Sequence, residues 1–571
     1  MGQGAGTVAR HRRRFVTGVG LGAPALLLPR RGLARTIEGG FSDTALNRGH
    51  NLRGGTNEAA AGASQDGPGE ARRRHQVIIV GAGVAGLAAA RALRAKGVTD
   101  YCLLELDDVI GGNSRSSTMA GLPCPTGAHY LPLPGAHATE VRDLLTELGV
   151  RDPGGGYDER MLCHSPQERL FIHGVWQDGV LPLVAQPRET LDEYRRFSDQ
   201  VEDYRRRGLF AIPSIRAASA ADLAPLQRSR FDAWLVRGGY RSEGLRWYLD
   251  YCCRDDYGAG IGAVSAWAGL HYFASRHGLH LPDERAAAHE GLLTWPEGNA
   301  WLVERMARPH RDRIFTGMMV RSVAPQGRAS RGPMIVDVVD WRGGASGRWQ
   351  ADWVIWAAPA FLAARVLDDK STEAANLRSA AGHIAYAPWA VANLLIDGDW
   401  RDDSVAMPAW DNVIFGSESL GYVDARHQRL DRKGGARLWT WYHALDPARS
   451  PAGASVGDPG GASAALSSAA AAARRRLLAR PWRGWVDAIL NDLGGAHPDM
   501  ARHLRRVDVH RWGHAMPIPA PGLVGSEALE VLRRPVGRFH MAHGDLAGYS
   551  IFEESLYWGM RAGADVALRV G

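Results

Sequence analysis

Short apolar runs of strand length alternate along the chain with stretches of helix-forming composition. The first run, at residues 77–80, is rich in β-branched side chains, and a helix-forming stretch at 87–96 follows it. Further runs lie at residues 102–105, 334–339 and 353–357. Strands that alternate with helices in this way predict an α/β fold around a buried sheet.

Two stretches depart from this pattern. Residues 35–71 are rich in Gly, Ala, Asn and Ser and carry few large apolar side chains. Residues 450–473 have a similar composition and end in an alanine run. Because neither stretch has much apolar surface to bury, we predict a disordered linker at 35–71 and a mobile surface insertion at 450–473, with helical propensity at its alanine end.

The positive charge of the chain is concentrated at its N-terminus. The 571 residues carry a formal charge of +7, but the first 34 hold six arginines and no acidic residue, which leaves +1 for the remainder. That balance offers no basic surface to phosphates and argues against a nucleic-acid partner. The five cysteines show no CxxC spacing, so neither a metal site nor a disulfide framework is predicted, and the oxidation state of the adjacent Cys252 and Cys253 stays open.

The N-terminus has the features of an export signal. Arg12-Arg13-Arg14-Phe15-Val16 resembles the twin-arginine motif, and an apolar stretch and a small-residue site at Gly32-Leu33-Ala34 follow it. The apolar stretch is shorter than the roughly 20 residues that span a membrane. We predict a cleaved signal at residues 1–34, read by the twin-arginine export machinery, and a periplasmic or secreted protein. A disordered basic tail is the alternative.

A glycine-rich turn lies directly after the first apolar run. The turn Gly81-Ala82-Gly83-Val84-Ala85-Gly86 separates a predicted strand from a predicted helix. In this context Gly81 permits a tight turn, Gly83 lets backbone N–H groups approach a pyrophosphate, and Gly86 lets the helix pack closely on the strand. The helix N-terminus then faces the phosphates. The turn therefore predicts a dinucleotide-binding site.

The next predicted strand, at residues 101–105, ends in Glu105, 19 residues after Gly86. A carboxylate at this place accepts hydrogen bonds from ribose hydroxyls and disfavours a 2′-phosphate. A looser glycine pattern at residues 258–263 lacks a β-branched strand before it and an acid-ending strand after it. We reject that pattern as a nucleotide site, and without a second fingerprint we expect no reduction by NAD(P)H.

The residues after Glu105 favour FAD over NAD. The stretch Leu106-Asp107-Asp108-Val109-Ile110-Gly111-Gly112-Asn113-Ser114-Arg115 resembles the flavin-containing amine oxidase and protoporphyrinogen oxidase superfamily, in which paired glycines follow the pyrophosphate and ribityl chain. The resemblance implies contacts of FAD with Leu106, Gly111, Gly112, Asn113 and Ser114. The family usually has arginine directly after the glycines, where this chain has Asn113, so we expect Arg115 to take over the phosphate contact.

Further patches occur in the order found in this superfamily. The resemblance places Gly127-Ala128-His129-Tyr130 beside the isoalloxazine ring and Val320 at the adenine, and segments 293–299 and 353–359 also match. It places Asp545 beside the ribityl and phosphate groups. A helix from about Ile551 to Arg569 would direct the N–H groups of Ile551 and Phe552 toward the N1–C2 carbonyl edge of the flavin.

The catalytic side chains are less well marked than the cofactor site. Many amine oxidases hold a lysine near the flavin on a strand that resembles residues 388–397, but this strand has no lysine. Ile551 stands where the family usually has an aromatic residue, and Tyr549 lies two residues earlier. The catalytic candidates are His129, Tyr130, His514 and Tyr549, with a structural hydrogen-bonding role as the alternative for each histidine. The tryptophans either line an apolar substrate site or fill the core.

The resemblance also implies a domain plan. A Rossmann-type, glutathione-reductase-like FAD domain at residues 72–145, 290–365 and 505–571 is interleaved with a mixed α+β substrate domain at 146–289 and 366–504. The implied function is transfer of a hydride from an organic substrate to flavin N5 and of electrons to oxygen or another acceptor. No terminal cysteine stands where some relatives attach flavin, so FAD is expected to be non-covalent. A desaturase-like C–C dehydrogenase and a flavin-free binding protein are the alternatives.

Overall fold

The computed structural model contains two compact units, Met1–Thr36 and Ile37–Gly571. The first unit is described only at Thr36, so the predicted signal at 1–34 lies outside the described residues. All elements named below belong to the second unit. The described residues are 36–43, 45–54, 73–217, 220–276, 278–279, 291–327, 332–343, 346–398, 400, 407–425, 427, 435–449 and 459–570.

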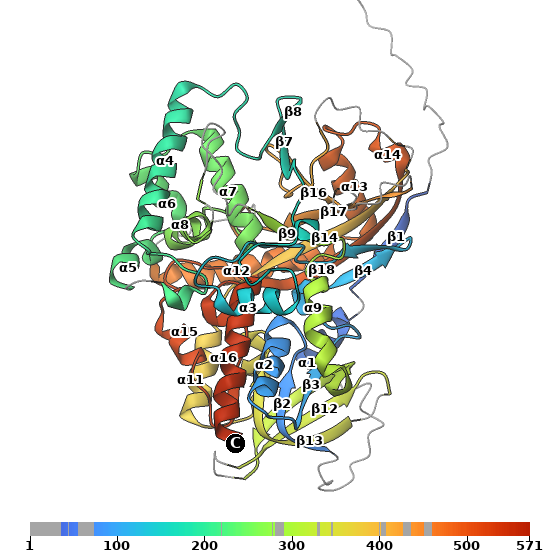
Figure 1. The fold of residues 1–571 in the computed structure, drawn as a ribbon, viewed down its shortest axis with the longest axis vertical. Coiled ribbons are helices and arrows are strands. Elements are labelled where there is room, and N and C mark those ends of the chain that lie inside the picture. The colour runs from blue at the N-terminus through green and yellow to red at the C-terminus, as the bar shows by residue number, and fades with distance from the viewer. Residues whose placement is uncertain are drawn as a thin grey trace, which may run out of the picture. The chain divides into compact units, whose positions relative to one another are not determined.

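A seven-stranded sheet carries the glycine turn (Figure 1). Its first six strands, in spatial order, are β10 (Ile314–Thr316), β3 (Tyr101–Glu105), β2 (Arg73–Val80), β13 (Ser346–Trp356), β12 (Met334–Asp340) and β11 (Met318–Pro325). β19 (Phe539–Met541) pairs with β13. The pairs of β10, β3, β2, β13 and β19 are parallel, whereas β11, β12 and β13 form an antiparallel meander. The parallel part gives the doubly covered sheet that the β-branched run predicts.

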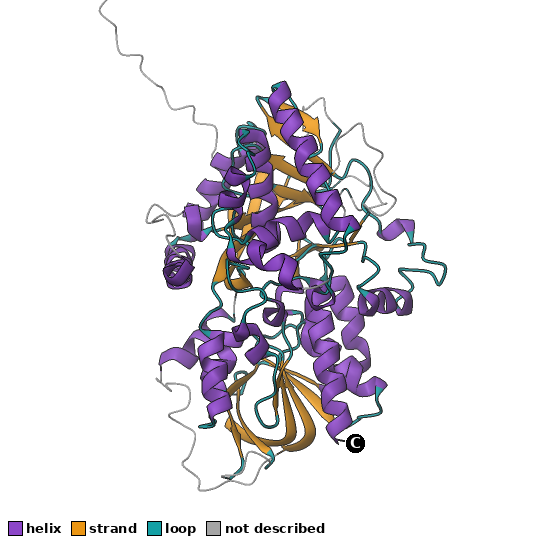
Figure 2. Ribbon diagram, turned by 90° about the vertical axis from the view of Figure 1, so that its left-hand side faces the viewer, coloured by secondary structure: helices purple, strands orange, loops and turns teal. Residues whose placement is uncertain are grey.

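Alternate side chains of β2 enter two different cores. Val77 and Ile79 pack with α2 (Val84–Ala95) and α16 (Phe552–Val570). Ile78 and Val80 pack on the opposite side with α11 (Thr372–Ala381) and α15 (Glu527–Leu532). Because successive strand residues point to opposite faces, a continuous apolar run is what a strand covered on both faces requires. Figure 2 shows helices on both sides of this sheet.

A second, eight-stranded sheet lies toward the upper part of Figure 1. In spatial order its strands are β1 (Glu38–Phe41), β18 (Leu504–Pro517), β14 (Tyr386–Ile396), β17 (Arg437–Ala444), β16 (Tyr422–Asp424), β15 (Asp411–Ile414), β7 (Glu168–Ile172) and β8 (Val175–Asp178). Trp389 and Val391 of β14 face a core shared with several helices of residues 188–274. Leu394 and Ile396 face α13 (Trp482–Leu493) and the C-terminal part of α12 (Pro459–Ala479).

Further helices cover the faces of the two sheets. They are α3 (Thr139–Glu147), α4 (Arg188–Arg206), α5 (Ala220–Arg228), α6 (Phe231–Arg237), α7 (Glu243–Tyr257), α8 (Ala266–Ala274), α9 (Ala300–Ala307), α10 (Ala360–Val366) and α14 (Met500–His503). Two small two-stranded sheets complete the fold: β4 (Ser116–Met119) and β5 (Leu122–Pro125) form a hairpin, and β6 (Tyr130–Pro132) pairs antiparallel with the distant β9 (Leu292–Thr294).

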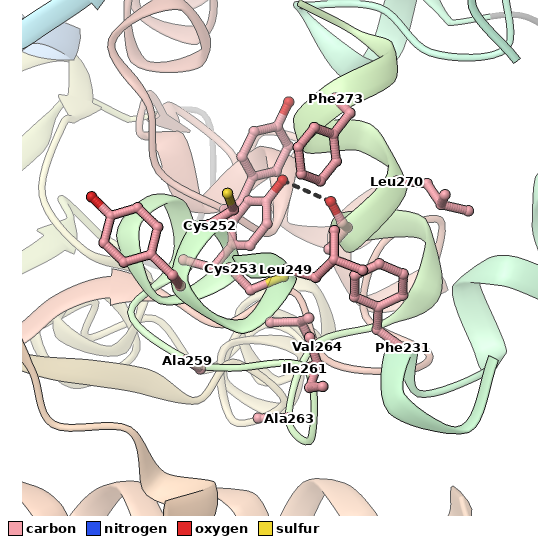
Figure 3. Packing of buried hydrophobic residues seen from close by; sticks show 14 of the residues in the cluster. Phe231, Leu249, Cys252, Cys253, Ala259, Ile261, Ala263, Val264, Leu270 and Phe273 are labelled. Carbon is pink, nitrogen blue, oxygen red and sulfur yellow. Dashed lines mark hydrogen bonds between the residues drawn. The ribbon is translucent and has the colours of Figure 1, made fainter. Parts of the chain in front are cut away.

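Figure 3 shows the core around α7 and α8, where Phe231, Leu249 and Phe273 pack together. Cys252 and Cys253 lie in this core as free thiols, and the other three cysteines are also buried and free. Gly258 ends α7 in a left-handed conformation with φ 69°. The rejected glycine pattern at 258–263 is therefore a helix end and a turn, without the strand and helix that a nucleotide site needs.

Three sequence-based boundaries differ from the structure. Within the predicted linker 35–71, residues 38–41 form β1, which is held by backbone pairing with β18. At the predicted mobile insertion 450–473, the helical propensity of the alanine end is confirmed, because residues from 459 onward belong to α12, but this helix is packed and buries Leu466, Ala470 and Ala473. The helical spacing of these residues forms a stripe, but alanine is too small to mark it in the sequence. Residues 505–517, predicted in the FAD domain, form β18 of the other sheet.

Candidate functional site

The turn from β2 to α2 is shaped by glycines that leave no room for side chains. Gly81 has φ 105°, and a Cβ there would lie 2.7 Å from the Ala357 carbonyl oxygen. A Cβ on Gly86 would lie 1.9 Å from the carbonyl oxygen of Gly81. The turn therefore packs tightly against its own backbone and against Ala357, which follows β13. Helix α2 begins within the pattern, at Val84. The remaining residues of the predicted pattern, Ala82, Val84 and Ala85, are buried.

Glu105 connects the end of β3 to this turn. One carboxylate oxygen accepts a hydrogen bond from the Ala82 N–H at 2.8 Å, and the other accepts one from the Asp107 N–H at 2.9 Å. Burial raises the pKa of Glu105, while the Ala82 N–H and the Arg115 charge oppose the rise. Two backbone donors thus fix the carboxylate at the position that the sequence predicts for the ribose ligand.

The paired glycines run beside the turn. Gly111 forms a parallel bridge with Gly83, and its N–H donates to the Ala82 carbonyl at 2.9 Å. A Cβ on Gly83 would lie 3.7 Å from the Cα of Gly112. Backbone without side chains on both segments is what close approach of a pyrophosphate requires, so this part of the chain fits a dinucleotide.

The polar residues after the paired glycines contact the second sheet and each other. Asn113 donates from its amide to the Ala515 carbonyl of β18. Arg115 forms an ion pair with Asp107 and lies over the Trp512 ring at 4.8 Å. The Arg115 Nε is buried and has no hydrogen-bond partner among the described residues. Arg115 therefore keeps one free donor for a phosphate, although Asp107 engages its other end. Ser114, also predicted at the cofactor, is buried.

Asp545 is a fully buried carboxylate that lies between Ala360, after the first sheet's β13, and Tyr386 in β14 of the second sheet. Its Oδ2 accepts hydrogen bonds from the Ala360 N–H at 2.7 Å and from the Tyr386 hydroxyl at 2.5 Å. Burial favours a higher pKa, but the His543 charge and the hydrogen bonds from His543 and Tyr386 outweigh it, and the pKa of Asp545 lies below its usual value.

In the part of the chain that the structure describes, no hydrogen bond reaches the other oxygen of Asp545, Oδ1. It lies 3.0 Å from His543 Nδ1, which forms an ion pair with it when that nitrogen carries a proton. In the neutral form in which Nδ1 accepts the Asp545 N–H at 3.2 Å, Nδ1 cannot donate to Oδ1. A buried ionised oxygen without a donor is costly unless a ligand hydroxyl reaches it. The glycine-lined backbone, the free Arg115 Nε and this oxygen together fit FAD.

Four rings gather next to the segment predicted to pass the flavin ring. His129 stacks on Tyr442 with ring centroids 4.4 Å apart and lies 5.3 Å from Trp410. Tyr130 contacts both His129 and Trp410 edge-on, at 5.0 and 5.9 Å. The Tyr442 hydroxyl donates to the Gly127 carbonyl at 3.1 Å. Burial lowers the pKa of His129 to about 3, so its imidazole is neutral at physiological pH.

Buried acids adjoin these rings. The Tyr130 hydroxyl donates to Asp255 Oδ2 at 2.9 Å, and the Tyr251 hydroxyl donates to Asp411 Oδ2 at 3.2 Å. Burial, with a smaller contribution from Asp256, raises the pKa of Asp255 to about 6. Burial raises the pKa of Asp411 well above its usual value, and the charges of Glu168 and Asp255 add to this.

Sequence reasoning missed four members of this cluster: Trp410, Tyr442, Asp255 and Asp411. The available signal was on α7, where Asp255 and Asp256 follow two buried cysteines in an otherwise core-forming helix. Charged residues are rarely buried without a partner, so adjacent acids on such a helix mark a polar site.

The other predicted residues lie elsewhere. His514 stacks on Phe361 at 4.3 Å and contacts Tyr386, beside Asp545 rather than beside His129. The Tyr549 hydroxyl is buried and donates to Glu554 at 2.7 Å. Val320 is buried in β11 opposite Val338. The structure thus joins His129 and Tyr130 but places His514 and Tyr549 in separate contacts.

The start of α16 differs electrostatically from the expectation. Ile551 precedes the helix and is half-buried, and Phe552 is its first residue. The next two residues, Glu553 and Glu554, are buried carboxyls in the first turn. Burial raises the pKa of Glu553, which the Arg276 charge opposes. Where Glu553 and Glu554 are ionised, their negative charge offsets the positive helix end on which the sequence argument depended.

The strand–glycine turn–helix unit, the acid-ending strand and the second sheet define an FAD-binding oxidoreductase of two interleaved sheets. The model of the flavin containing amine oxidoreductase family matches residues 84–567, and the chain belongs to that family. Flavin is the family's cofactor, and the chain is an FAD-dependent oxidoreductase.

Matches to individual proteins are local in sequence. The chain is 38% identical over 101 residues to polyamine oxidase 1 of Zea mays, which is 15% of this chain and 20% of that protein. It is 39% identical over 93 residues to protoporphyrinogen oxidase 2 of Arabidopsis thaliana, covering 16% and 18% of the two chains. The aligned stretches thus span about a fifth of these relatives.

Matches to solved structures are global in fold. Putrescine oxidase bound to putrescine superposes with a TM-score of 0.61 at 18% identity, covering 87% of this chain and 99% of the other. Cyclohexylamine oxidase from Brevibacterium oxydans gives 0.59 at 18% identity, over 87% and 99%. At this identity the likeness establishes the fold. Among the described residues, no helix is long and apolar enough to cross a membrane.

Proposed function

We propose that this chain oxidises an organic amine with a non-covalently bound FAD. The observation that carries the proposal is the set of His129, Tyr130, Trp410 and Tyr442 rings beside the buried acid Asp255. Aromatic faces and carboxylates both attract cations, and a desolvated setting strengthens each attraction. A protonated amine has the charge that this environment favours.

Different residues of the chain would bind the cofactor and the amine. Glu105 and the glycine turn hold the ADP half of the cofactor, and Asp545 Oδ1 takes a ribityl hydroxyl. Asp255 is ionised above pH 6, because its pKa is about 6, and Tyr130 orients it. His129 stays neutral and adds no charge that would repel the amine. The ionised Asp255 would take the ammonium proton, and a bound FAD would then supply the hydride acceptor at N5 for the neutral amine and the route of the electrons to oxygen or another acceptor.

The test is anaerobic reduction of the yellow protein, followed by loss of flavin absorbance. Putrescine, longer polyamines, a primary alkylamine and an uncharged isosteric alcohol are compared. We expect an amine to bleach the flavin and the alcohol to leave it oxidised. A purified protein that releases no FAD on denaturation would contradict the cofactor, whereas a yellow protein that no amine bleaches would contradict the substrate class alone.

A second candidate function is dehydrogenation of a C–C bond in a larger apolar substrate. Two observations favour it: β14 contains no lysine, and the half-buried Ile551 stands where the family usually has an aromatic residue. Polyprenyl and porphyrin compounds in the same anaerobic assay separate the candidates. Bleaching by these compounds and by no amine would assign the chain to the second reaction.

We also propose that the protein is exported through the twin-arginine route. The support is the Arg12-Arg13-Arg14-Phe15-Val16 segment and the small-residue site after it. Replacing Arg12, Arg13 and Arg14 together by lysine keeps the charge and removes the motif. We expect the flavoprotein to move from the periplasmic or secreted fraction to the cytoplasmic fraction, and an unchanged distribution would refute this route.

A further inference from the structure

A segment between the export signal and the FAD fold joins two parts of the molecule. We call residues 37–43 and 45–54 the N-terminal strap; it comprises β1 and α1 (Leu46–Gly54). β1 adds to the edge of the eight-stranded sheet, parallel to β18, with Glu38 opposite Arg506 and Phe41 opposite Val509. Main-chain pairing explains why so polar a segment is ordered, since edge strands accept a partner through the backbone alone.

Side chains fasten the strap beside β1. Asp43 forms an ion pair with Arg511 of β18, with Arg511 Nε donating to Asp43 Oδ2 at 2.8 Å. The Arg511 guanidinium also lies 3.6 Å from the centre of the Phe41 ring. The Asp43 side chain is only 5% exposed, and burial raises its pKa against the opposing effect of Arg511. The Asp43 charge is also felt at Arg115, which locates this anchor near the polar residues after the paired glycines.

At the other end of the strap, Arg48 of α1 contacts the turn after Glu105. Arg48 donates to the Leu106 carbonyl at 3.1 Å and to both oxygens of Asp108, at 3.0 and 2.6 Å. The Arg48 residue is 9% exposed, whereas the Asp108 side chain is 42% exposed, so the forked contact is shielded from water on the arginine side. The same turn supplies the Asp107 N–H that orients the Glu105 carboxylate. Arg48 therefore holds the segment that fixes the predicted ribose ligand.

We propose that the N-terminal strap is a clasp that retains FAD, with Arg48 as a positioning residue for the adenosine half of the site. The strap is anchored to β18 through Asp43 and to the turn Leu106–Asp108 through Arg48. It adds no group to the reacting end of the flavin, so it governs how long the cofactor stays bound and leaves the reaction itself unchanged.

The inference rests on the FAD assignment of the proposed function, and the experiment separates the two. FAD release from the holoenzyme is followed by the rise of flavin fluorescence after dilution. We expect Arg48→Ala to release FAD about tenfold faster, the size of one lost charge-assisted contact. The flavin spectrum of each variant is recorded at saturating FAD before release is started. Arg48→Lys, which keeps the charge but loses the forked geometry, lies between the two.

The matched control is Arg342→Ala. Arg342 also contacts Asp108, at 3.3 Å, but its side chain is 54% exposed and it belongs to the β12–β13 connection rather than to the strap. We expect FAD release from this variant within about twofold of the parent, since exposed pairs contribute little. Parent-like release from Arg48→Ala would overturn the clasp, as would equal acceleration in both variants. A parent protein without FAD would instead refute the proposed function.

Hydrogen exchange gives a second readout that does not depend on a variant. If the strap closes on the cofactor, removal of FAD raises exchange at the β1 amides and at the Asp107 amide together. The Ser42 N–H, bonded to the Val509 carbonyl at 2.9 Å, is one reporter of the strap. Unchanged protection of β1 in the apoprotein would show that the strap is a static part of the sheet and would contradict the proposal.

Discussion

The nucleotide end of this site is formed by the main chain of one local segment, whereas the substrate end is formed by side chains from distant segments. At the nucleotide end, consecutive residues of one strand–turn–helix unit shape the backbone, and Glu105 is fixed by two main-chain N–H groups. At the substrate end, His129, Trp410, Tyr442 and Asp255 come from segments far apart in sequence and meet through side chains. A local backbone site tolerates little variation, whereas a side-chain site assembled from several elements can change its substrate without changing the fold.

The largest effect is expected at the nucleotide end, from Gly86→Val. A Cβ at this position would lie 1.9 Å from the Gly81 carbonyl oxygen, and both atoms belong to packed backbone. Overpacking of this kind commonly costs about 1 to 3 kcal/mol even where neighbours can move. We expect no FAD in the purified protein and a lower midpoint of thermal unfolding. Gly135→Ala is the control, because the backbone there is not left-handed and nothing lies within 4 Å of the added Cβ.

The next effect is expected at the substrate end, from Asp255→Asn. If the carboxylate binds an ammonium group, kcat/KM for the amine falls about a hundredfold, as for a buried charge pair that loses one partner. FAD content and flavin spectrum remain those of the parent. A variant that loses FAD would show that the two ends are coupled, against the comparison drawn above.

The pH dependence sharpens this prediction. A carboxyl with a pKa of about 6 is neutral below that pH and ionised above it, so kcat/KM for a cationic amine rises as pH increases through about 6. The rise disappears in Asp255→Asn. The charged groups around Asp255 are Asp256, Arg276 and Arg254, and the Tyr130 hydrogen bond lowers its pKa. Tyr130→Phe is therefore expected to move the rise to higher pH, and a downward move would contradict the assigned contact.

The contrast between a local main-chain site and a site of distant side chains also explains which residues could be predicted from the sequence. Gly81 and Gly86 can be read from the sequence because a short chain segment fixes their geometry, and a Cβ at either position would meet backbone. The ribose contact of Glu105 stays a prediction. Trp410 and Asp411 could not be located, because nothing local ties the start of β15 to α7. The strap was misjudged because β1 is stabilised by main-chain pairing with β18, which composition does not record. The buried face of α12 was missed because most of its residues are alanines, which do not stand out as an apolar pattern.

A smaller effect is expected from Glu105→Gln. The amide oxygen still accepts one backbone N–H, while the other donor and the ribose lose an ionised acceptor. Hydrogen bonds to charged groups contribute about 1.5 to 3 kcal/mol, so FAD affinity is expected to fall roughly tenfold. Titration of the apoprotein with FAD measures this. The amine reduction rate at saturating FAD should not change, and a large loss of that rate would mean that Glu105 also acts on the reacting end.

The smallest effect is expected from Tyr549→Phe. Tyr549 is a catalytic candidate from the sequence, but the structure places its hydroxyl apart from His129 and Tyr130. The Tyr549 hydroxyl donates to Glu554 and lies 3.3 Å from His271 Nε2. Glu554 keeps hydrogen bonds from the Ser214 N–H and the Trp558 indole after the substitution. The lost bond should cost about 1 kcal/mol of unfolding free energy, measured by urea denaturation.

Turnover separates structure from catalysis at the same position. Because the Tyr549 ring remains and only a buried hydroxyl is removed, kcat/KM for the best amine should stay within about twofold of the parent, since a factor of two corresponds to only a few tenths of a kcal/mol. Tyr130→Phe in the same assay shifts the pH profile, because its hydroxyl touches Asp255. A tenfold loss in Tyr549→Phe with unchanged stability would place this hydroxyl at the substrate. The substrate end would then extend to the start of α16, where Glu554 would join Asp255 as an acid that contacts the amine.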